Sequence, residues 1–229
     1  MRPKAILIFA DRFDVDLARR SLPTAACALL RVPRLEDGDA PAADVHLFSR
    51  DVPSNCARTA NTHRQSGRDF RERLENAIET ICALGYEEIV VVGRDCPNLY
   101  AGDIALAFEQ LRCNRLVLGP DHRGGCYLIA FRSEDRELLR GVRWNRNTDR
   151  AELAARCFNS GVYLLAQKQD LDSWADLRLL ALSGDWIGRI AAHLLASFSE
   201  FGDALGHFVD LAAQHVRVRG QMPPPALAG

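Results

Sequence analysis

The chain has 229 residues, of which 48% are hydrophobic, and its 29 basic and 30 acidic residues leave a formal net charge of −1. This length and apolar content fit one large α/β domain, or a domain with a helical appendage. The balanced charge gives no support to a long-range attraction for nucleic acid or an anionic membrane. No stretch approaches the run of about 18 apolar residues that a membrane span needs.

The seven cysteines are scattered along the chain and never show C-x-x-C spacing. An odd, scattered set argues against a disulfide framework and against a zinc site. We therefore expect most of them to be small buried hydrophobes in a reducing cytoplasm. Cys96 adjoins Asp95, but no histidine lies nearby in the sequence to activate it as a nucleophile, so we favour a structural role for it.

Residues 6–10 are apolar, but the segment is too short for a signal-peptide core and lacks a small-residue cleavage site, so it is interpreted as part of a first strand. Strand and helix patterns alternate over the first two-thirds of the chain, which is typical of an α/β sheet. Pro23 interrupts the first helical pattern and marks a start or a kink. Strands are predicted at residues 5–9, 45–48, 89–92, 115–118, 127–131 and 162–166, loops at 35–42 and 49–63, and helices at 17–30, 66–84, 102–111, 134–139, 149–157 and 173–182.

The clearest helical pattern follows Ser66. Ser66 and Asp69 resemble a capping box with Asp in place of the preferred Glu, and Gly85 is placed as a helix-stop glycine. Apolar residues fall on one face at helical spacing, which predicts a helix that covers the sheet. They are Phe70, Leu74, Ala77, Ile78, Ile81 and Cys82.

From Gly184 onward the pattern changes to two amphipathic helices, predicted at residues 187–198 and 205–212. This helical pair either packs on the sheet domain or forms the contact of a homodimer. The tail at residues 221–229 contains three consecutive prolines and is expected to be disordered. We therefore divide the chain into an α/β domain at residues 1–182, a helical extension at 183–220 and a tail at 221–229.

The most informative segment reads V-V-V-G-R-D-C-P-N-L and spans residues 90–99. Its apolar run stops at Gly93, and Asp95 follows two residues later. Ligands in open α/β sheets gather outside the carboxyl ends of strands, and Mg²⁺ prefers one or two protein carboxylates together with phosphate oxygens. Asp95 is thus either a cation-holding carboxylate or the cap of the next helix or turn.

Four further segments carry candidate chemistry. Residues 65–67 read Q-S-G and lead to Arg73, and residues 117–131 contain paired glycines that allow a ligand to approach the backbone closely. The third is W-N at residues 144–145. The fourth is a carboxylate cluster after the last predicted strand, in which Asp170 is a ligand, a supporting partner or a structural residue and Asp176 caps or decorates the last helix.

In this order, the segments resemble a bacterial family of GT-A-type transferases, often labelled glycosyltransferases or nucleotide-diphospho-sugar transferases. The family's pattern is G-x-D-C-P-x-L, then G-P-x-x-D-G-G-Y-Y-L, then W-S, then D-x-D-T-x-x-D-L. The corresponding segments here read G-R-D-C-P-N-L, G-P-D-H-R-G-G-C-Y-L, W-N and D-L-D-S-W-A-D-L. The similarity covers roughly three-quarters of the chain, from residue 5 to residue 180, and the ordered G-x-D-C-P and D-x-D matches make it specific.

This resemblance implies a GT-A-like three-layer α/β/α fold with a mixed, mainly parallel sheet and a nucleotide or nucleotide sugar bound at the strand ends. It implies that Asp95 and Asp172 are the catalytic residues and flank one divalent cation, Mg²⁺ or Mn²⁺. Arg19 and Arg94 are expected to add positive charge at the phosphates. The small-molecule acceptor is expected near Gly124, Gly125, Tyr127 and Trp144, although core packing explains the two aromatic residues equally well.

The chain departs from the family pattern in two places. The family's P-V-P-G-x-V-K-T-R-L reads F-D-V-D-L-A-R-R-S-L at residues 13–22, so that Asp16 replaces the glycine and Arg19 the lysine. Asp14 and Asp16 would repel a triphosphate unless a metal or Arg12 compensates, and an arginine does not reproduce the geometry of a lysine. The second departure is Arg123, which replaces an acidic residue and reverses the local charge.

Two functions follow from this pattern. The first is a metal-dependent transferase that uses a nucleotide sugar or a nucleoside triphosphate, for glycosyl or nucleotidyl transfer to a small acceptor. The second is a catalytically degenerate GT-A-like binding or regulatory protein. An open cleft in which Asp95 and Asp172 converge favours the enzyme, and Arg123 hydrogen-bonded to either carboxylate favours the degenerate protein. A small cluster at Arg143, Arg146 and Arg150 is interpreted as a solvated face rather than a nucleic-acid site.

Overall fold

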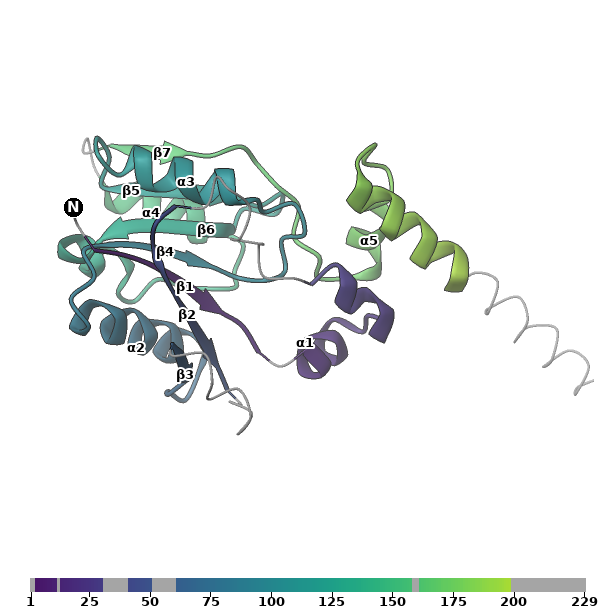
Figure 1. Cartoon of the computed structure of the whole chain (residues 1–229), viewed down its shortest axis with the longest axis horizontal. Coiled ribbons are helices and arrows are strands. Elements are labelled where there is room, and N and C mark those ends of the chain that lie inside the picture. Colours follow the sequence, from purple (N-terminus) through teal and green to yellow (C-terminus); the bar gives the residue numbers. More distant parts are fainter. Residues whose placement is uncertain (1–2, 12, 31–40, 51–60, 158–160, 199–229) are drawn as a thin grey trace, which may run out of the picture.

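The computed structural model describes residues 3–11, 13–30, 41–50, 61–157 and 161–198. Its centre is a seven-stranded sheet in the order β3-β2-β1-β4-β6-β5-β7 (Figure 1). β6 runs antiparallel to β4 and β5, and the other neighbouring strands are parallel, which confirms the mixed, mainly parallel sheet. The strands are β1 (Lys4–Phe9), β2 (Asp44–Ser49), β3 (Thr62–Arg64), β4 (Glu88–Val92), β5 (Leu116–Pro120), β6 (Cys126–Arg132) and β7 (Val162–Leu164).

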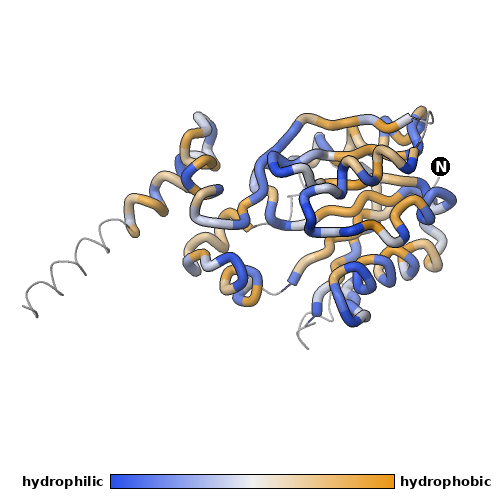
Figure 2. Tube along the Cα trace, turned by 180° about the vertical axis from the view of Figure 1, so that it is seen from behind, coloured by the Kyte–Doolittle hydropathy of each residue, from blue (hydrophilic) through white to orange (hydrophobic). Residues whose placement is uncertain are grey.

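The central strands β1 and β4 are apolar on both faces because helices cover both sides of the sheet. Successive side chains of a strand point to opposite faces. In β1, Leu7 lies in the core beneath α2 (Phe70–Ala83), whereas Ile6 and Ile8 lie in the core beneath α3 (Ala101–Gln110). The near-continuous apolar runs of β1 and β4 follow from this double burial. Figure 2 shows the central strands as hydrophobic stretches, whereas hydrophobic and hydrophilic residues alternate along the helices.

Two shorter elements complete the cover of the sheet. The 3₁₀ helix η2 (Ser133–Leu139) and α4 (Asp149–Arg156) place Leu139 and Leu153 in the same core as α2. The sheet therefore lies between two helical layers, as the resemblance implies. Every helix in the described part of the chain is too short or too polar to cross a lipid bilayer.

A third core lies beyond the carboxyl ends of β1 and β4, where the segment that follows β1 packs against the last described helices (Figure 1). It joins α1 (Phe13–Arg20) and the 3₁₀ helix η1 (Thr24–Ala28) to α5 (Trp174–Leu180) and the helical residues 186–198. It combines residues from both sides of the boundary predicted after residue 182, and the division into domain and extension stays a prediction. Its buried members include Leu17, Leu30, Leu171, Leu177, Ile187 and Ala191.

The structure differs from the prediction in four local features. Residues 62–64 form β3 rather than part of a loop, because they pair with the end of β2. The main helix begins at Phe70, since the Asp69 carboxylate accepts the Glu72 amide at 2.9 Å and caps it in place of Ser66. The predicted helix at 17–30 is two elements separated at Pro23, which fits the lost amide of proline. The predicted helix at 134–139 is 3₁₀.

Several predicted segments lie outside the described residues. They are most of the loops at 35–42 and 49–63, the helix at 205–212 and the tail at 221–229.

Candidate functional site

A cavity of about 390 Å³, which we call the main cavity because Asp95 and Asp172 line it, lies at the carboxyl ends of β1, β4 and β5. This edge is where ligands bind in open α/β sheets. The aromatic side chains of Phe9, Phe70 and Trp144 form part of its wall, and acidic residues outnumber basic ones. Its charged lining consists of Asp11, Asp16, Arg19, Arg20, Arg73, Arg94, Asp95, Asp121, Asp149, Asp170 and Asp172.

Asp95 and Asp172 converge on one cation, the guanidinium of Arg20. Arg20 Nη2 donates to Asp95 Oδ2 at 2.8 Å, and its Nε donates to Asp172 Oδ1 at 3.0 Å. The two carboxylates come from the loop after β4 and the segment before α5, as the sequence predicts. Their side chains remain 29% and 39% exposed, so both are open to the main cavity.

The Arg20 side chain is only 6% exposed and also lies 3.3 Å from Asp16, one helical turn earlier. Burial acts to lower the pKa of Arg20, but attraction to Asp95, Asp16 and Asp172 outweighs it, so its pKa lies above the ordinary value. For Asp95, burial raises the pKa; Arg20 opposes this effect and Asp172 adds to it. The guanidinium therefore offsets the repulsion that two converging carboxylates would otherwise feel.

Arg94 stabilises this arrangement through its contacts with Asp16. It is buried, and its Nε and Nη2 donate to Asp16 Oδ2 at 3.0 and 2.6 Å, while Nη2 also donates to the Asp11 carbonyl. The repulsion expected from Asp16 is thus compensated by Arg20 and Arg94. Arg12, which the sequence offered for this role, lies outside the described residues. Because Arg94 is held by Asp16, its predicted contact with phosphate stays a prediction.

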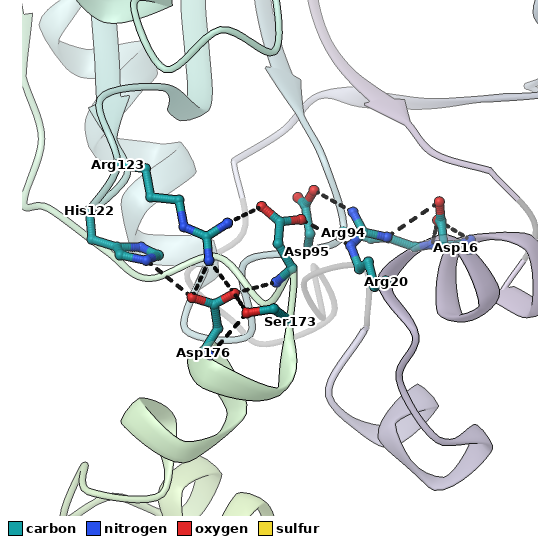
Figure 3. Close-up of polar contacts among 9 residues, drawn as sticks. Asp16, Arg20, Arg94, Asp95, His122, Arg123, Ser173 and Asp176 are labelled. Carbon is teal, nitrogen blue, oxygen red and sulfur yellow. Dashed lines mark hydrogen bonds and ion pairs between the residues drawn. The ribbon is translucent and has the colours of Figure 1, made fainter.

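The Asp176 carboxylate is buried and contacts several side chains, instead of lying on an exposed face of the last helix (Figure 3). Arg123 Nη2 donates to both of its carboxylate oxygens at 2.6 Å, His122 Nε2 lies 3.2 Å from Oδ1, and Ser173 Oγ donates to Oδ2 at 2.7 Å. Burial acts to raise the pKa of Asp176, but these partners outweigh it and the pKa is lowered. Arg123 Nη1 also reaches Asp172 Oδ2 at 3.3 Å.

Asp121, Asp149 and Asp170 add buried carboxylates to the same cavity. Asp121 Oδ1 accepts the amides of Gly124 and Gly125 at 2.6 and 2.8 Å, which closes a tight turn. Asp170 Oδ1 and Asp149 Oδ1 are buried without a hydrogen-bond partner among the described residues. Burial raises the pKa of both groups, and Asp95 and Asp121 raise that of Asp170 further.

A divalent cation fits Asp95 and Asp172 on the chemistry of these two donors. Within the described residues, no group of three or more His, Cys, Asp or Glu side chains is arranged to hold a metal. Mg²⁺ bound with a nucleotide, however, uses one or two carboxylates and takes its remaining oxygens from phosphate and water. Arg20 already bridges this pair as a stand-in cation, which shows that one positive group reaches both carboxylates.

The residues predicted to bind the acceptor differ in their hydrogen bonds and in their exposure to the main cavity. The Gly124 and Gly125 amides are engaged by Asp121, and the Tyr127 hydroxyl donates to the Ala166 carbonyl at 2.9 Å. Trp144 is half-buried and lines the main cavity with Gly125 and Tyr127. Their contact with an acceptor stays a prediction.

The structure also shows the surroundings of Arg19, Gln65 and the cysteines. Arg19 is exposed and lines the main cavity. Gln65 is buried and bonds the carbonyls of Ala10 and Phe48, so it ties strand ends together, and it also accepts from Arg73. Cys96 is buried and burial raises the pKa of its thiol, in line with a structural role. The six cysteines in the described residues are free.

A family model described as "Uncharacterized protein conserved in bacteria (DUF2064)" matches residues 22–146, more than half of the chain. The chain belongs to the DUF2064 family. The matched region contains Asp95 but ends before Asp172, and it begins after Arg20. No curated protein matches this DUF2064 chain.

Solved structures share the fold of this DUF2064 protein. One from Desulfovibrio desulfuricans G20, provisionally assigned as a nucleotide-diphospho-sugar transferase, has a TM-score of 0.70 and 22% identity over 87% of this chain and 96% of that chain. The bifunctional IspDF of Campylobacter jejuni has a TM-score of 0.53 and 13% identity, over 77% of this chain and 53% of that chain. Rv0371C from Mycobacterium tuberculosis H37Rv was solved in complex with manganese. It has a TM-score of 0.50 and 14% identity, over 78% of this chain and 97% of that chain. The fold is therefore that of nucleotide-diphospho-sugar transferase structures.

Sequence reasoning missed the central residue of the DUF2064 site, which is Arg20 rather than its neighbour Arg19. One signal was present, because Asp16 and Arg20 stand four residues apart, the spacing of an ion pair on a helix. Asp121 and Asp149 were also missed, since each is separated from Asp95 by long stretches of sequence and joins it only at the sheet edge.

Proposed function

We propose that this DUF2064 protein is a metal-dependent transferase that uses a nucleotide sugar or a nucleoside triphosphate as donor. The observation that carries this proposal is the convergence of Asp95 and Asp172 on a single cationic group at the carboxyl end of β4. The fold shared with a nucleotide-diphospho-sugar transferase structure supports the class of donor. The manganese in Rv0371C is consistent with the class of metal.

In this proposal Asp95 and Asp172 hold Mg²⁺ or Mn²⁺, which when bound supplies positive charge to the donor phosphates. Arg19 is exposed at the cavity wall, where its guanidinium is free to approach a phosphate oxygen. Arg94 and Arg20 form ion pairs with Asp16, so their positive charge offsets the repulsion between this carboxylate and the donor phosphates. The acceptor occupies the side of the main cavity formed by Gly125 and Trp144.

The cytoplasmic location and the homodimer predicted from the sequence belong to the same proposal. A reducing compartment suits the free cysteines in the described residues. The helical residues 186–198 pack within this chain in the third core, so the homodimer stays a prediction.

A degenerate binding protein is the second candidate, and one observation favours it. Arg123 lies 3.3 Å from Asp172 and Arg20 occupies the space between the two carboxylates, so arginines neutralise the proposed metal ligands. Such a protein would bind an anionic ligand without a metal.

Titration calorimetry with nucleoside triphosphates and nucleotide sugars, with and without Mn²⁺, separates the two candidates. The transferase predicts at least one nucleotide whose affinity requires Mn²⁺ and falls by at least about tenfold in Asp95→Asn, whose lost charge weakens the metal site directly. Glu109→Gln removes a charge from an exposed position on α3 and should leave the affinity unchanged. Equal binding with and without Mn²⁺ would favour the degenerate protein, and no binding of any nucleotide would contradict the transferase.

A further inference from the structure

A second cavity, of about 680 Å³, adjoins the main cavity and has the opposite charge. We call it the arginine cavity, because Arg71, Arg143 and Arg146 line it against one acidic residue, Asp69. Phe70 and Trp144 line both cavities. A molecule held in the arginine cavity therefore lies one side chain away from the proposed site of transfer.

The acidic groups around the arginine cavity are already engaged. The Asp69 carboxylate caps α2 through the Glu72 amide, and the Glu72 carboxylate pairs with Arg68 on both oxygens. Glu152 accepts from the Arg143 amide and guanidinium at 3.2 and 3.3 Å, so it offsets the charge of Arg143.

Arg71 and Arg146 have no such partner. Both are exposed, and within the described part of the chain neither forms an ion pair. Trp144 lines the same cavity, and its Nε1–H is buried and has no hydrogen-bond partner among the described residues. Unpaired buried donors are rare in folded proteins and call for an explanation. Two exposed guanidinium groups without an ion pair in the described part of the chain thus line one cavity together with the Trp144 side chain.

We propose that the arginine cavity binds the phosphate monoester group of the acceptor molecule, an inference that rests on the transferase proposed above. A phosphate monoester carries a charge of about −1.5 to −2 near pH 7, which matches the two unpaired arginines, and its oxygens suit the guanidinium fork. The remainder of the acceptor lies along the Trp144 ring toward the main cavity. The acidic lining of the main cavity disfavours an anionic group there unless a metal is bound, so the two anionic ends of the reactants are held apart.

Nuclear magnetic resonance of the full chain tests this proposal with inorganic phosphate as the probe. The chain has three tryptophans, and the Trp144 indole signal is the one that disappears in Trp144→Phe. We expect phosphate to shift this signal saturably at constant ionic strength, and acetate to do so at least about tenfold more weakly, because it carries a single charge. The double variant Arg71→Gln/Arg146→Gln should weaken phosphate binding by a similar factor.

The matched control is Arg112→Gln/Arg178→Gln, which removes the same charge from exposed positions outside both cavities. It should bind phosphate as the parent does. An unchanged phosphate affinity in Arg71→Gln/Arg146→Gln, or equal shifts by acetate, would overturn the proposal.

Nucleotide calorimetry on the same double variant keeps this test separate from that of the proposed function. We expect Mn²⁺-dependent nucleotide affinity to be retained in Arg71→Gln/Arg146→Gln. Its loss would assign the arginine cavity to the donor phosphates and overturn the acceptor proposal while sustaining the transferase. Phosphate binding without any nucleotide binding would leave an anion site here and remove its role as an acceptor subsite.

Discussion

The backbone N–H of Leu171 donates a 2.7 Å hydrogen bond to the carbonyl of Asp95. This bond joins the segment before α5 to the loop after β4, two parts of the chain that are far apart in the sequence. Leu171 itself is fully buried in the third core. The packing of one apolar side chain therefore brings the Asp172 carboxylate to the same guanidinium as Asp95, and the site depends on that helical core.

Replacement of Arg20 by glutamine tests the central cation. Removing one member of a buried ion pair leaves uncompensated charge, so we expect Arg20→Gln to lower the free energy of unfolding by about 3 kcal/mol in metal-free buffer. Because Asp95 and Asp172 then lack their cation, Mn²⁺ should stabilise the variant more than it stabilises the parent. Urea denaturation with and without Mn²⁺ measures both effects.

Arg19→Gln is the control for that experiment, since Arg19 is the exposed neighbour of Arg20 on α1. Its stability and its response to Mn²⁺ alone should be close to those of the parent. A variant Arg20→Gln that Mn²⁺ stabilises no more than the parent would contradict the assignment of these carboxylates to a cation.

Gly93→Ala should disturb Asp95 without altering a charge. A Cβ at position 93 would lie 2.4 Å from Asp95 Oδ1, so the carboxylate must move. We expect loss of Mn²⁺-dependent nucleotide binding comparable with that in Asp95→Asn, and a stability loss of about 1–3 kcal/mol from overpacking. Calorimetry and thermal denaturation measure the two changes.

Gly102→Ala is the matched control, because nothing lies within 4 Å of a Cβ there and the position is in α3. It should be stabilising by about 0.5–1 kcal/mol, the helix preference for alanine over glycine. If Gly93→Ala binds nucleotide with the parent's affinity, nucleotide binding does not depend on the position that the Asp95 carboxylate has in this structure.

The His46–His63 pair predicts a dependence of stability on pH. Their ring nitrogens lie 3.0 Å apart, and burial lowers the pKa of both below the ordinary value, with His63 adding to the effect on His46. The unfolded chain therefore takes up protons first, so this contribution is present above about pH 6.5 and is lost as the pH falls below it.

Urea denaturation at about pH 7.5 and 5.5 measures that loss, and His46→Gln should show a smaller difference between the two pH values than the parent. His193→Gln, which changes an exposed histidine on the C-terminal helix, should leave the difference unchanged. Equal pH dependence in the parent and in His46→Gln would show that the pair does not titrate on folding.

Tyr127→Phe separates packing from acceptor binding. The hydroxyl donates to the Ala166 carbonyl, and its removal leaves that acceptor unpaired, so we expect a stability loss of about 1–2 kcal/mol. Phosphate binding in the arginine cavity and nucleotide binding should both be unchanged, since the hydroxyl points to Ala166. A drop in ligand affinity without a drop in stability would instead place this hydroxyl on a substrate.

The local elements of this DUF2064 protein could be predicted because they follow from short-range patterns. The apolar runs of β1 and β4 and the helical face of α2 are confirmed, since burial on a sheet imposes periodicity on neighbouring residues. The short strand β3 was missed because three polar residues carry no such pattern, and only pairing with β2 makes them a strand.

For the site, the sequence by itself determined which acids follow the strands, namely Asp95 and a cluster that includes Asp172, and the family resemblance paired these two residues. The tertiary structure decided what lies between them. Arg20 reaches both because α1 and α5 pack in one core, and Arg123 turns to the buried Asp176. Such ion pairs join residues distant in sequence, and Coulomb attraction depends on their separation in space, which no local pattern of residues encodes.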